Sequence, residues 1–347
     1  MRKLASIQRI WKIEPIEGAD RIELAHVLGW QCVANKGQFK EGDLAVYFEI
    51  DSFLPIKENF EFLRSSCYKK NEIMGEGFKI RTMKFKGQLS QGLLQPISAF
   101  TELRDMSLEV GDDVSDELGV RKWEIEERAT TGGNIIGQLP YDVPHTDEVR
   151  VQVMPEVLDL FKDYPYYIST KMDGSSHSVS IDQDGFHVTG HNYEYKDDDS
   201  SAFYRLVNSL DLKTKMQELM ADRGIKLLTI QGEFCAPGIQ LNRLKLTKPA
   251  WYVFTVRVDG NRVGLDEMSS ITTYLGLDQV PIEEKGVNLK EHYPDVDSIL
   301  ARADGEYPNG GKKEGIVIRT QEPIYSPEIG GPLSFKVVSN KYLLKNE

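Results

Sequence analysis

The stretch Tyr166–Ile181, YYISTKMDGSSHSVSI, decides how the second half of this chain folds. It opens with a β-leaning run, Tyr166–Thr170, that leads directly into Lys171. The pair Asp173-Gly174 then predicts a tight turn, and His177–Ile181 follows as a second β-leaning run. We therefore expect a hairpin of two partner strands with a lysine at the end of the first. Taken alone, a K-x-D-G sequence also fits an ordinary surface hairpin.

Outward from this hairpin, the second half alternates predicted strands with a few helices. Apolar residues at i, i+3, i+4 and i+7 predict a helix capped by Ser200 or Ser201, and its continuation reaches Gly224. Because strands and helices do not alternate regularly, we expect an α+β domain built on sheets rather than on βαβ units. The further predicted strands are Leu227–Ile230, Trp251–Val258, Gly315–Arg319 and Leu333–Val338.

The first hundred residues show short β-leaning runs separated by turn residues. Strands of this spacing are typical of a small β-barrel, and a five-stranded OB-fold fits the size. Glycine and proline residues then interrupt the pattern between positions 132 and 144, so we place a domain boundary there. The predicted strands are Leu4–Ile13, Ile22–Val27, Gln31–Ala34, Leu44–Ile50 and Leu93–Ile97. The predicted domains are an OB-type nucleic-acid-binding module over 1–125, a linker over 126–148 and the α+β domain over 149–347.

The composition is that of an ordinary folded protein. Of the 347 residues, 40% are hydrophobic and 28% charged, which excludes disordered and collagen-like classes. No apolar run is long enough to cross a bilayer, and the charged N-terminus predicts neither a secretory nor a transit segment. Three widely separated cysteines, Cys32, Cys67 and Cys235, argue against a disulfide framework or a thiolate zinc site. We therefore expect a cytoplasmic protein with no membrane partner.

The net charge of −12 argues against nucleic-acid binding but does not exclude it, because the charge is unevenly spread. Residues 101–127 hold ten acidic residues and three basic ones. Residues 69–86 hold six basic residues against Glu72 and Glu76, and this basic stretch is the predicted contact with nucleic acid. Two solvated faces of opposite charge would give the same pattern. The six basic residues are Lys69, Lys70, Lys79, Arg81, Lys84 and Lys86.

Most of the usual catalytic signatures are absent. The chain has no HExxH, GxSxG or GxGxxG sequence. Gly305–Lys312 is similar to a phosphate-binding loop, but an extra glycine displaces its lysine and no Ser or Thr follows. The histidines lack metal-ligand spacing, and His187 and His191 fall in a predicted strand, which favours structural roles. A nucleotide site in this chain would therefore not be a Walker loop.

Four short charged sequences remain in the second half, the first three at the end of a predicted strand and the fourth inside one. In chain order they carry Lys171, Glu233, Glu314 and Lys336. Each one alone is compatible with an ordinary charged strand end, but their joint occurrence in this order is much harder to attribute to chance. The four sequences are Lys171–Ser176, Gln231–Glu233, Glu314–Arg319 and Ser334–Val338.

This ordered set resembles the covalent nucleotidyltransferases, the superfamily of ATP-dependent polynucleotide ligases and mRNA capping enzymes. In that superfamily K-x-D-G is motif I. The other matches are motif III at Glu233, motif IIIa at Trp251–Val258, motif IV at Glu314-Gly315 and motif V at Lys336. Further stretches look like RNA ligases of the Deinococcus and Naegleria type, which join an N-terminal OB module to a C-terminal nucleotidyltransferase domain. These stretches are Ile80–Lys84, Ser90–Leu94 and Ser334–Lys345.

The resemblance implies a role for each matching residue. Lys171 would attack the α-phosphate of ATP and become linked to AMP, so its pKa must fall, which Lys336 and a divalent cation would promote. Glu314 and Asp173 would serve Mg²⁺ or Mn²⁺. The expected catalytic residues are Lys171, Lys336 and Asp173. The expected nucleotide-binding residues are Thr170, Lys171, Arg150, Glu233, Phe254, Glu314 and Lys336.

Three of these residues have more specific expected contacts. Glu233 would accept a hydrogen bond from the ribose. Arg150 would hold a substrate or pyrophosphate group in a phosphate fork. Phe254 would stack on the adenine, although a core position fits its strand equally well.

Two positions depart from the family pattern. Many ligases have an Arg-Asn pair after motif I, whereas this chain has Gly190-His191-Asn192, so His191 is a candidate for that phosphate contact. Motif V carries Lys336 without a second lysine two residues later, and Lys341 or Lys345 are its candidate substitutes.

The residues and the resemblance together predict an ATP-dependent RNA ligase that seals 3′-hydroxyl and 5′-phosphate ends. We expect a monomer acting on nicked or broken RNA, in particular duplex RNA. A capping-type guanylyltransferase or a DNA ligase stays open, although the OB module precedes motif I and the chain ends just after motif V, which argues against both. A non-catalytic OB-type RNA-binding protein is the alternative from another class, and the intact lysine and glutamates argue against it.

Overall fold

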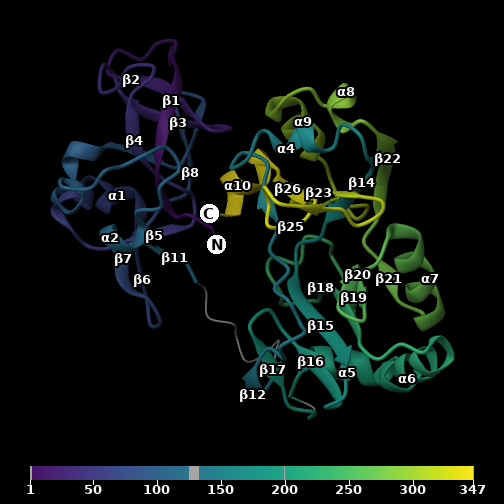
Figure 1. Ribbon diagram of the computed structural model, residues 1–347. Coiled ribbons are helices and arrows are strands. Elements are labelled where there is room, and N and C mark those ends of the chain that lie inside the picture. The colour runs from purple at the N-terminus through teal and green to yellow at the C-terminus, as the bar shows by residue number, and fades with distance from the viewer. Residues whose placement is uncertain (1, 125–132, 199, 347) are drawn as a thin grey trace. The chain divides into compact units, whose positions relative to one another are not determined.

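The computed structural model describes residues 2–124, 133–198 and 200–346, which divide into two compact units (Figure 1). The first unit comprises Met1–Glu126, Gln152–Pro155 and Leu343–Glu347, and the second comprises Glu127–Val151 and Glu156–Tyr342. The described part of the segment predicted as a linker groups with the second unit, where Ile135–Gln138 is a strand. Among the described residues, no helix has the length and apolar character needed to cross a bilayer.

The five strands predicted for the first hundred residues are all present and form one antiparallel sheet. They are β1 (Ala5–Pro15), β2 (Ile22–Val27), β3 (Trp30–Asn35), β4 (Leu44–Phe48) and β10 (Leu93–Pro96). Their order is β10-β4-β1-β2-β3. The long strand β1 is bulged between Ile10 and Lys12, so its first half pairs with β4 and its second half with β2. Sharing one bent strand between two neighbours curls the sheet toward the expected barrel.

A smaller sheet and a hairpin complete the first unit. Phe48 of the barrel sheet shares one core with Phe60 and Phe78. The remaining strands are β5 (Ser52–Leu54), β6 (Tyr68–Asn71), β7 (Gly75–Lys79), β8 (Thr82–Phe85), β9 (Gln88–Gln91) and β11 (Arg121–Lys122). The helical segments are η1 (Glu58–Leu63), α1 (Arg64–Cys67), η2 (Ile97–Ala99), η3 (Thr101–Leu103) and α2 (Ser115–Leu118). The four-stranded sheet has the order β11-β5-β7-β6, and β8 pairs with β9.

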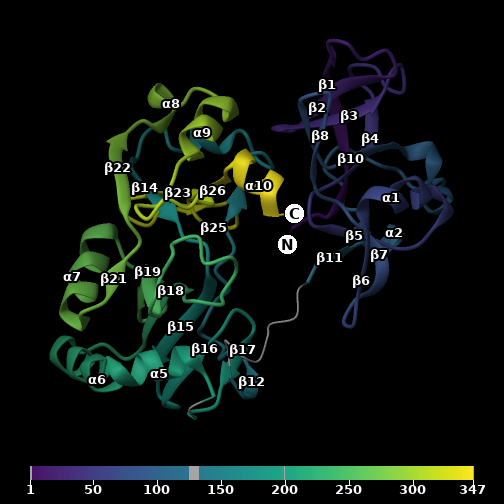
Figure 2. The ribbon, with the colours of Figure 1, turned by 180° about the vertical axis from the view of Figure 1, so that it is seen from behind.

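The larger sheet of the second unit carries three helices on one face. Its strands are β12 (Ile135–Gln138), β15 (Ser175–Ile181), β16 (Phe186–Thr189), β17 (Tyr193–Tyr195), β18 (Leu228–Cys235), β19 (Ala250–Val258), β20 (Asn261–Arg262) and β21 (Asp278–Gln279). The order is β12-β17-β16-β15-β18-β19-β20, with β21 beside β19. The helices are α5 (Ala202–Ser209), α6 (Leu212–Arg223) and α7 (Leu265–Leu275) (Figure 2). Their apolar residues, such as Phe203, Met216 and Ile271, bury Ile230 and Val253 of the sheet.

A second sheet of five strands lies in the same unit. Its strands are β13 (Val149–Arg150), β14 (Pro165–Lys171), β22 (Ile282–Val287), β23 (Gly315–Thr320) and β26 (Ser334–Val338). The order is β13-β26-β23-β14-β22, antiparallel except between β13 and β26. The other elements are α4 (Val157–Leu160), α8 (Leu289–His292), α9 (Val296–Ala303), α10 (Asn340–Asn346) and the paired strands β24 (Tyr325–Ser326) and β25 (Gly331–Pro332).

The helix predicted from Ser200 or Ser201 to Gly224 is two helices. The Ser201 hydroxyl accepts the Tyr204 N–H and caps α5. Asp211 then adopts a left-handed conformation with φ of 50°, which interrupts the helical hydrogen-bond ladder before α6 begins. Gly224 ends α6 in a left-handed conformation, as the sequence indicated.

The predicted hairpin around Asp173-Gly174 is wrong. Strand β14 pairs with β22 and β23, whereas β15 pairs with β16 and β18 of the other sheet. The turn therefore carries the chain from one sheet to the other instead of folding it back on itself. Local turn residues could not distinguish these outcomes, because both partners of β14, the strands β22 and β23, lie far away in the sequence.

His177 is enclosed in the aromatic core beneath this turn. Its side chain is 1% exposed, and its ring packs against Phe203 and Phe234 at centroid distances of 4.5 and 5.2 Å. Its Nδ1 donates to the carbonyl of Ser175 at 3.0 Å. Burial lowers the pKa of His177 to about 4, so the imidazole is neutral at pH 7.

We expect the free energy of unfolding to fall as the pH is lowered from about 6.5 to 4, because in this range only the unfolded chain protonates His177. A fall of the pKa from 6.5 to about 4 corresponds to a loss of up to about 3 kcal/mol. His177→Leu should flatten this part of the profile, measured by urea unfolding at a series of pH values. The control His145→Leu removes an exposed histidine and should keep the wild-type profile. Identical profiles for wild type and both variants would contradict this assignment.

Candidate active site

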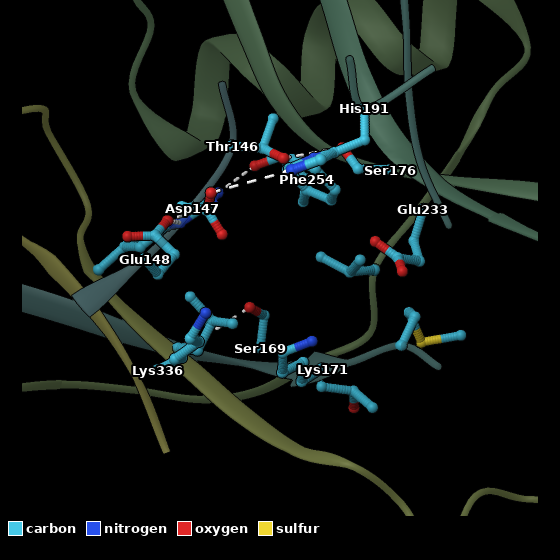
Figure 3. A pocket seen from close by; sticks show the side chains of 15 residues that line it. Thr146, Asp147, Glu148, Ser169, Lys171, Ser176, His191, Glu233, Phe254 and Lys336 are labelled. Atoms are coloured by element: carbon cyan, nitrogen blue, oxygen red, sulfur yellow. Dashed lines mark hydrogen bonds and ion pairs between the residues drawn. The ribbon is translucent and has the colours of Figure 1, made fainter. Parts of the chain in front are cut away.

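A pocket of about 170 Å³ opens between the two sheets of the second unit (Figure 3). The smaller sheet contributes residues of β14, β23 and β26, and the larger sheet contributes residues of β15, β18 and β19. Figure 3 shows Lys171, Glu233 and Lys336 around one open space. The lining residues are Thr146, Asp147, Glu148, Ser169, Thr170, Lys171, Met172, Ser176, His191, Glu233, Phe254, Val280, Val317, Arg319 and Lys336.

Lys171 lies at the end of β14 in an acidic environment. Its Nζ is 2.7 Å from the Glu314 carboxylate, and both side chains are largely buried. Burial by itself would lower the pKa of Lys171, but the charges of Glu314 and Glu233 outweigh it and raise the pKa. The lysine is therefore an ammonium in this arrangement, which differs from the lowered pKa that the attack on a phosphate requires.

Glu314 reaches Lys171 because a glycine follows it. Gly315 pairs with Lys171 across β14 and β23, and a Cβ added at Gly315 would lie 2.0 Å from the carbonyl oxygen of Val337. Only glycine lets β23 begin this close to β26. Tyr307 fixes the same corner, because its hydroxyl donates to the Lys171 carbonyl at 2.7 Å and accepts the Glu314 N–H at 3.2 Å.

Asp173 holds the turn rather than lining the pocket. Its carboxylate accepts hydrogen bonds from the Tyr342 hydroxyl at 2.8 Å and from the Arg243 guanidinium, and the residue is 3% exposed. The neighbouring Gly174 N–H donates to the Glu233 carboxylate at 3.2 Å, and a Cβ there would lie 2.5 Å from the Phe234 carbonyl oxygen. The K-x-D-G sequence is thus a rigid crossing between sheets that presents Lys171 to the pocket.

Glu233 lies opposite Lys171 on β18, where it pairs with Ser176 of β15. Burial raises the pKa of Glu233 to about 7, the nearby Glu314 charge adds to this rise, and the Lys171 charge opposes it. A carboxyl group in this state can accept or donate a hydrogen bond to a ligand hydroxyl near neutral pH.

Each of the two sheets contributes an apolar residue to the pocket. Phe254 of β19 is half-buried, and Val317 of β23 lines the pocket from the other sheet. The carbonyl of Phe254 accepts a hydrogen bond from Arg319, whose guanidinium lies 5.5 Å from the Phe254 ring centroid. Thr170 also lines the pocket, with its hydroxyl donating to Glu283 at 2.7 Å. This slot suits a flat aromatic group.

Lys336 and Arg150 come from adjacent strands but differ in position. Lys336 on β26 lines the pocket and pairs with Val317 of β23. Arg150 on β13 pairs with Lys336, yet it is not among the described residues that line the pocket. The predicted phosphate fork at Arg150 therefore stays a prediction.

Several lining residues were missed by the sequence analysis. Glu148 accepts from Arg319 at 2.7 Å and from the hydroxyl of Ser334, and Thr146 and Ser176 exchange a hydrogen bond of 2.7 Å. Ser176, Arg319 and Ser334 lie within the motif stretches but had no expected role. Glu148 and Thr146 lie outside them, and their only signal was nearness in sequence to Arg150. His191, named as a candidate for the missing motif arginine, does line the pocket.

The C-terminal stretch supports the site from behind. The Ser339 N–H donates to the Glu314 carbonyl at 2.8 Å. Lys341, a candidate for the second motif V lysine, instead pairs with Asp304 at 2.8 Å and is not among the described lining residues. The side chain of Lys345, the other candidate, lies outside the described residues. Beyond Lys336, the described part of this stretch therefore supports the site through the Ser339 backbone and through Tyr342, which bonds Asp173, and not through a second lysine.

The predicted nucleic-acid contacts lie on two hairpins of the first unit. Lys69 and Lys70 are exposed on β6, and Lys84 and Lys86 are exposed at the β8–β9 hairpin. Lys79 is the exception. Lys79 is 8% exposed, and its Nζ lies 3.5 Å from the Asp51 carboxylate and over the Trp123 ring. These contacts favour a structural role over a contact with nucleic acid. Arg81 is half-buried, which leaves four fully exposed bases among the six.

The chain is similar to known proteins over its whole length. An OB-fold domain model matches residues 4–97, and an RNA ligase model matches residues 164–338. Naegleria gruberi RNA ligase with pyrophosphate is 34% identical, with a TM-score of 0.86 and coverage of 99% of this chain and 98% of that one. A glutamate-to-alanine mutant of it with ATP and Mn gives 34% identity, a TM-score of 0.87 and 99% and 98% coverage. A lysine-to-methionine mutant of it with AMP and Mn is 33% identical, with a TM-score of 0.87 and coverage of 100% of both chains.

The barrel and the lysine-containing pocket between two sheets define a polynucleotide ligase, an enzyme that forms phosphodiester bonds. The chain belongs to the RNA ligase family. The expected OB-type barrel followed by an α+β nucleotidyltransferase domain is confirmed. No curated protein sequence matches the chain at a significant level.

Proposed function

We propose that this RNA ligase is ATP-dependent and works through a covalent Lys171–AMP intermediate. The Lys171 amine, once deprotonated, attacks the α-phosphorus of ATP, and the bond to pyrophosphate breaks. The AMP then passes to a 5′-phosphate end of RNA, which frees the lysine. A 3′-hydroxyl finally attacks this activated phosphate, forming the phosphodiester and releasing AMP. The observation that carries this proposal is the Lys171 Nζ inside a pocket bounded by Glu233, Phe254 and Lys336.

Each neighbouring residue has a place in this scheme. Phe254 and Val317 would enclose the adenine, and Glu233 would accept from the ribose hydroxyl. Lys336 would stabilise negative charge on the phosphate, and Arg150 on the adjacent strand would hold the departing pyrophosphate. Asp173 acts through the turn that it holds, as a positioning residue, and Thr170 fixes the strand end through Glu283.

The carboxylates beside Lys171 fit a divalent cation of the kind that binds together with a nucleotide. Among the described residues, no three His, Cys, Asp or Glu side chains could hold a metal by themselves. Mg²⁺ and Mn²⁺ in nucleotide enzymes commonly use one or two carboxylates and the substrate phosphates, and Glu314 is the matching carboxylate here. Such a cation would supply positive charge that neutralises Glu314 and favours the deprotonated Lys171.

RNA would be held mainly by phosphate and shape contacts. Lys69, Lys70, Lys84 and Lys86 are the exposed bases of the first unit available for phosphates, with the half-buried Arg81 between the hairpins. We propose nicked or broken duplex RNA as the substrate and the cytoplasm as the location. Because every group of the pocket comes from one chain, a monomer would suffice.

The choice of nucleotide tests the proposal directly. The protein is incubated with ATP or GTP, each with Mg²⁺ and with Mn²⁺, and its intact mass is measured. We expect an added AMP with ATP and no adduct with GTP. An adduct with GTP alone would assign a capping-type guanylyltransferase, and no adduct with either would favour a non-catalytic RNA-binding protein.

We expect sealing to require a ribose at the 3′-hydroxyl end. A site that hydrogen-bonds the 2′-hydroxyl leaves its polar groups unpaired with a deoxyribose, which typically costs several powers of ten in rate. Sealing rates on two nicked duplexes that differ only in this terminal sugar decide the point, with 5′-phosphate strands kept identical. Equal rates would indicate a general DNA ligase.

A further inference from the structure

A second cavity of about 270 Å³ lies beside the nucleotide pocket and is lined by three arginines. Arg257 comes from β19, Arg262 from β20 and Arg319 from β23. The two cavities share Thr146, Asp147, Glu148, Phe254 and Arg319 as walls. Gly330 and Gly331, at the start of β25, also line this cavity. Among the described residues, Lys171, Glu233, Glu314 and Lys336 do not line this second cavity.

The arginines are placed where folding alone would not favour them. Arg257 and Arg262 stand directly opposite each other in the antiparallel pair β19–β20. Like charges in this cross-strand position destabilise a sheet. The burial of Arg262 and Arg319 adds a desolvation cost, because their side chains are only 13% and 6% exposed.

The carboxylates nearby do not balance this charge. Glu148 is committed to Arg319 at 2.7 Å and to the Ser334 hydroxyl, and it lies 3.7 Å from Arg262. Asp147 also lines the cavity, but its side chain is 60% exposed and faces His191 at 3.9 Å. Three guanidinium groups therefore face one buried and one largely solvated carboxylate.

Of the three arginines, Arg257 makes the fewest hydrogen bonds and ion pairs within the described part of the chain. One of its terminal nitrogens donates to the Gly260 carbonyl, and its Nε is buried without a hydrogen-bond partner in the described part of the chain. Burial lowers the pKa of Arg257, and burial together with the Arg319 charge lowers the pKa of Arg262 to about 10. Both shifts indicate positive charge that a bound anion would stabilise.

We propose that this arginine-lined cavity binds a phosphate group of a ligand other than the nucleotide held at Lys171. Guanidinium groups are the preferred partners of phosphate, because their fixed N–H donors match its oxygens. In an RNA ligase this phosphate could belong to the RNA substrate, and free pyrophosphate or polyphosphate carries the same group. Only the identification of the ligand as RNA rests on the proposed function.

The test compares Arg257→Ala with the control Arg223→Ala, which removes an exposed arginine of α6. Binding of a 5′-phosphorylated RNA oligonucleotide is measured without ATP by fluorescence anisotropy at several salt concentrations. Binding of inorganic pyrophosphate is measured by calorimetry. We expect Arg257→Ala to lower the affinity for either the RNA or pyrophosphate by about tenfold, as for the loss of a hydrogen bond to a charged group. For RNA, the slope of log K against log salt should also fall by about one.

Each outcome decides the proposal. Weaker RNA binding by Arg257→Ala identifies an RNA phosphate, and weaker pyrophosphate binding identifies a free phosphate ligand. Arg257→Lys should restore part of the affinity lost, and it replaces Arg257→Ala if the alanine variant does not fold. Affinities within twofold of wild type for both probes would overturn the site. Intact mass after ATP, measured on wild type alone, tests the proposed function separately, because an adduct can form whether or not this cavity binds phosphate.

Discussion

Lys171→Ala forms no covalent adduct when it is incubated with ATP and a divalent cation, whereas wild type gains the mass of AMP. This is the expected result because Lys171 has the amine that lies beside Glu314 and Glu233 in the pocket. Lys336 also lines the pocket, from β26 of the same sheet, and we propose it as a phosphate contact rather than as the nucleophile. Intact-mass measurement detects the adduct or its absence directly.

The control for this experiment is Lys162→Ala, which removes an exposed lysine before β14. It should form the adduct as wild type does. Removing Lys171 leaves two carboxylates without their cation, so the melting temperature of both variants is measured as well. An adduct that persists in folded Lys171→Ala would transfer the nucleophile to another residue.

Glu314→Gln should lower the rate of adduct formation by roughly 10²- to 10³-fold, as for the loss of one preorganised charge in an active site. The substitution keeps the shape of the side chain and the corner formed by Tyr307 and Gly315. It removes only the charge that pairs with Lys171 and that would serve a cation. The rate is measured at fixed ATP with Mg²⁺ and with Mn²⁺.

The matched control is Glu306→Gln, a glutamate that also pairs with a lysine, Lys312, but is 55% exposed. It should leave the rate and the melting temperature unchanged. Glu314→Gln should melt within about 2 °C of wild type, a shift that corresponds to under 1 kcal/mol for a unit of this size. A much lower melting temperature with normal adduct formation per folded molecule would assign Glu314 a structural role.

The five strands of the barrel sheet could be predicted from the sequence because each is a β-leaning run between turn residues, whereas the strands β5 to β9 and β22 were missed. β2 was predicted to the residue, and β1, β3, β4 and β10 to within a few residues. Their partners could not be predicted in the same way. Strand pairing depends on contacts between residues far apart in sequence, and this is why the turn after Lys171 was assigned to a hairpin.

The residues of the site also differ in whether a local sequence pattern could identify them. Lys171, Glu233 and Lys336 could be found because each belongs to a short motif at or within a strand, and the structure brings them to one pocket. Glu148 and Arg319 face each other across 171 positions of sequence, and nothing local marks them as a pair. The metal role expected for Asp173 came from the family resemblance, whereas its hydrogen bonds to Arg243 and Tyr342 could not be predicted because both partners lie far away in the sequence.

The contact between Tyr342 and Asp173 has a consequence for protein synthesis. The two residues are 169 positions apart, and Tyr342 holds the turn that presents the nucleophile. A ribosome therefore completes Lys171 and its motif long before it adds the residue that steadies them. We expect a nascent chain, or one cut short before position 342, to present Lys171 on a turn in which Asp173 keeps its bond to Arg243 but lacks the one to Tyr342. The full ability to join RNA ends would then be acquired only late in translation.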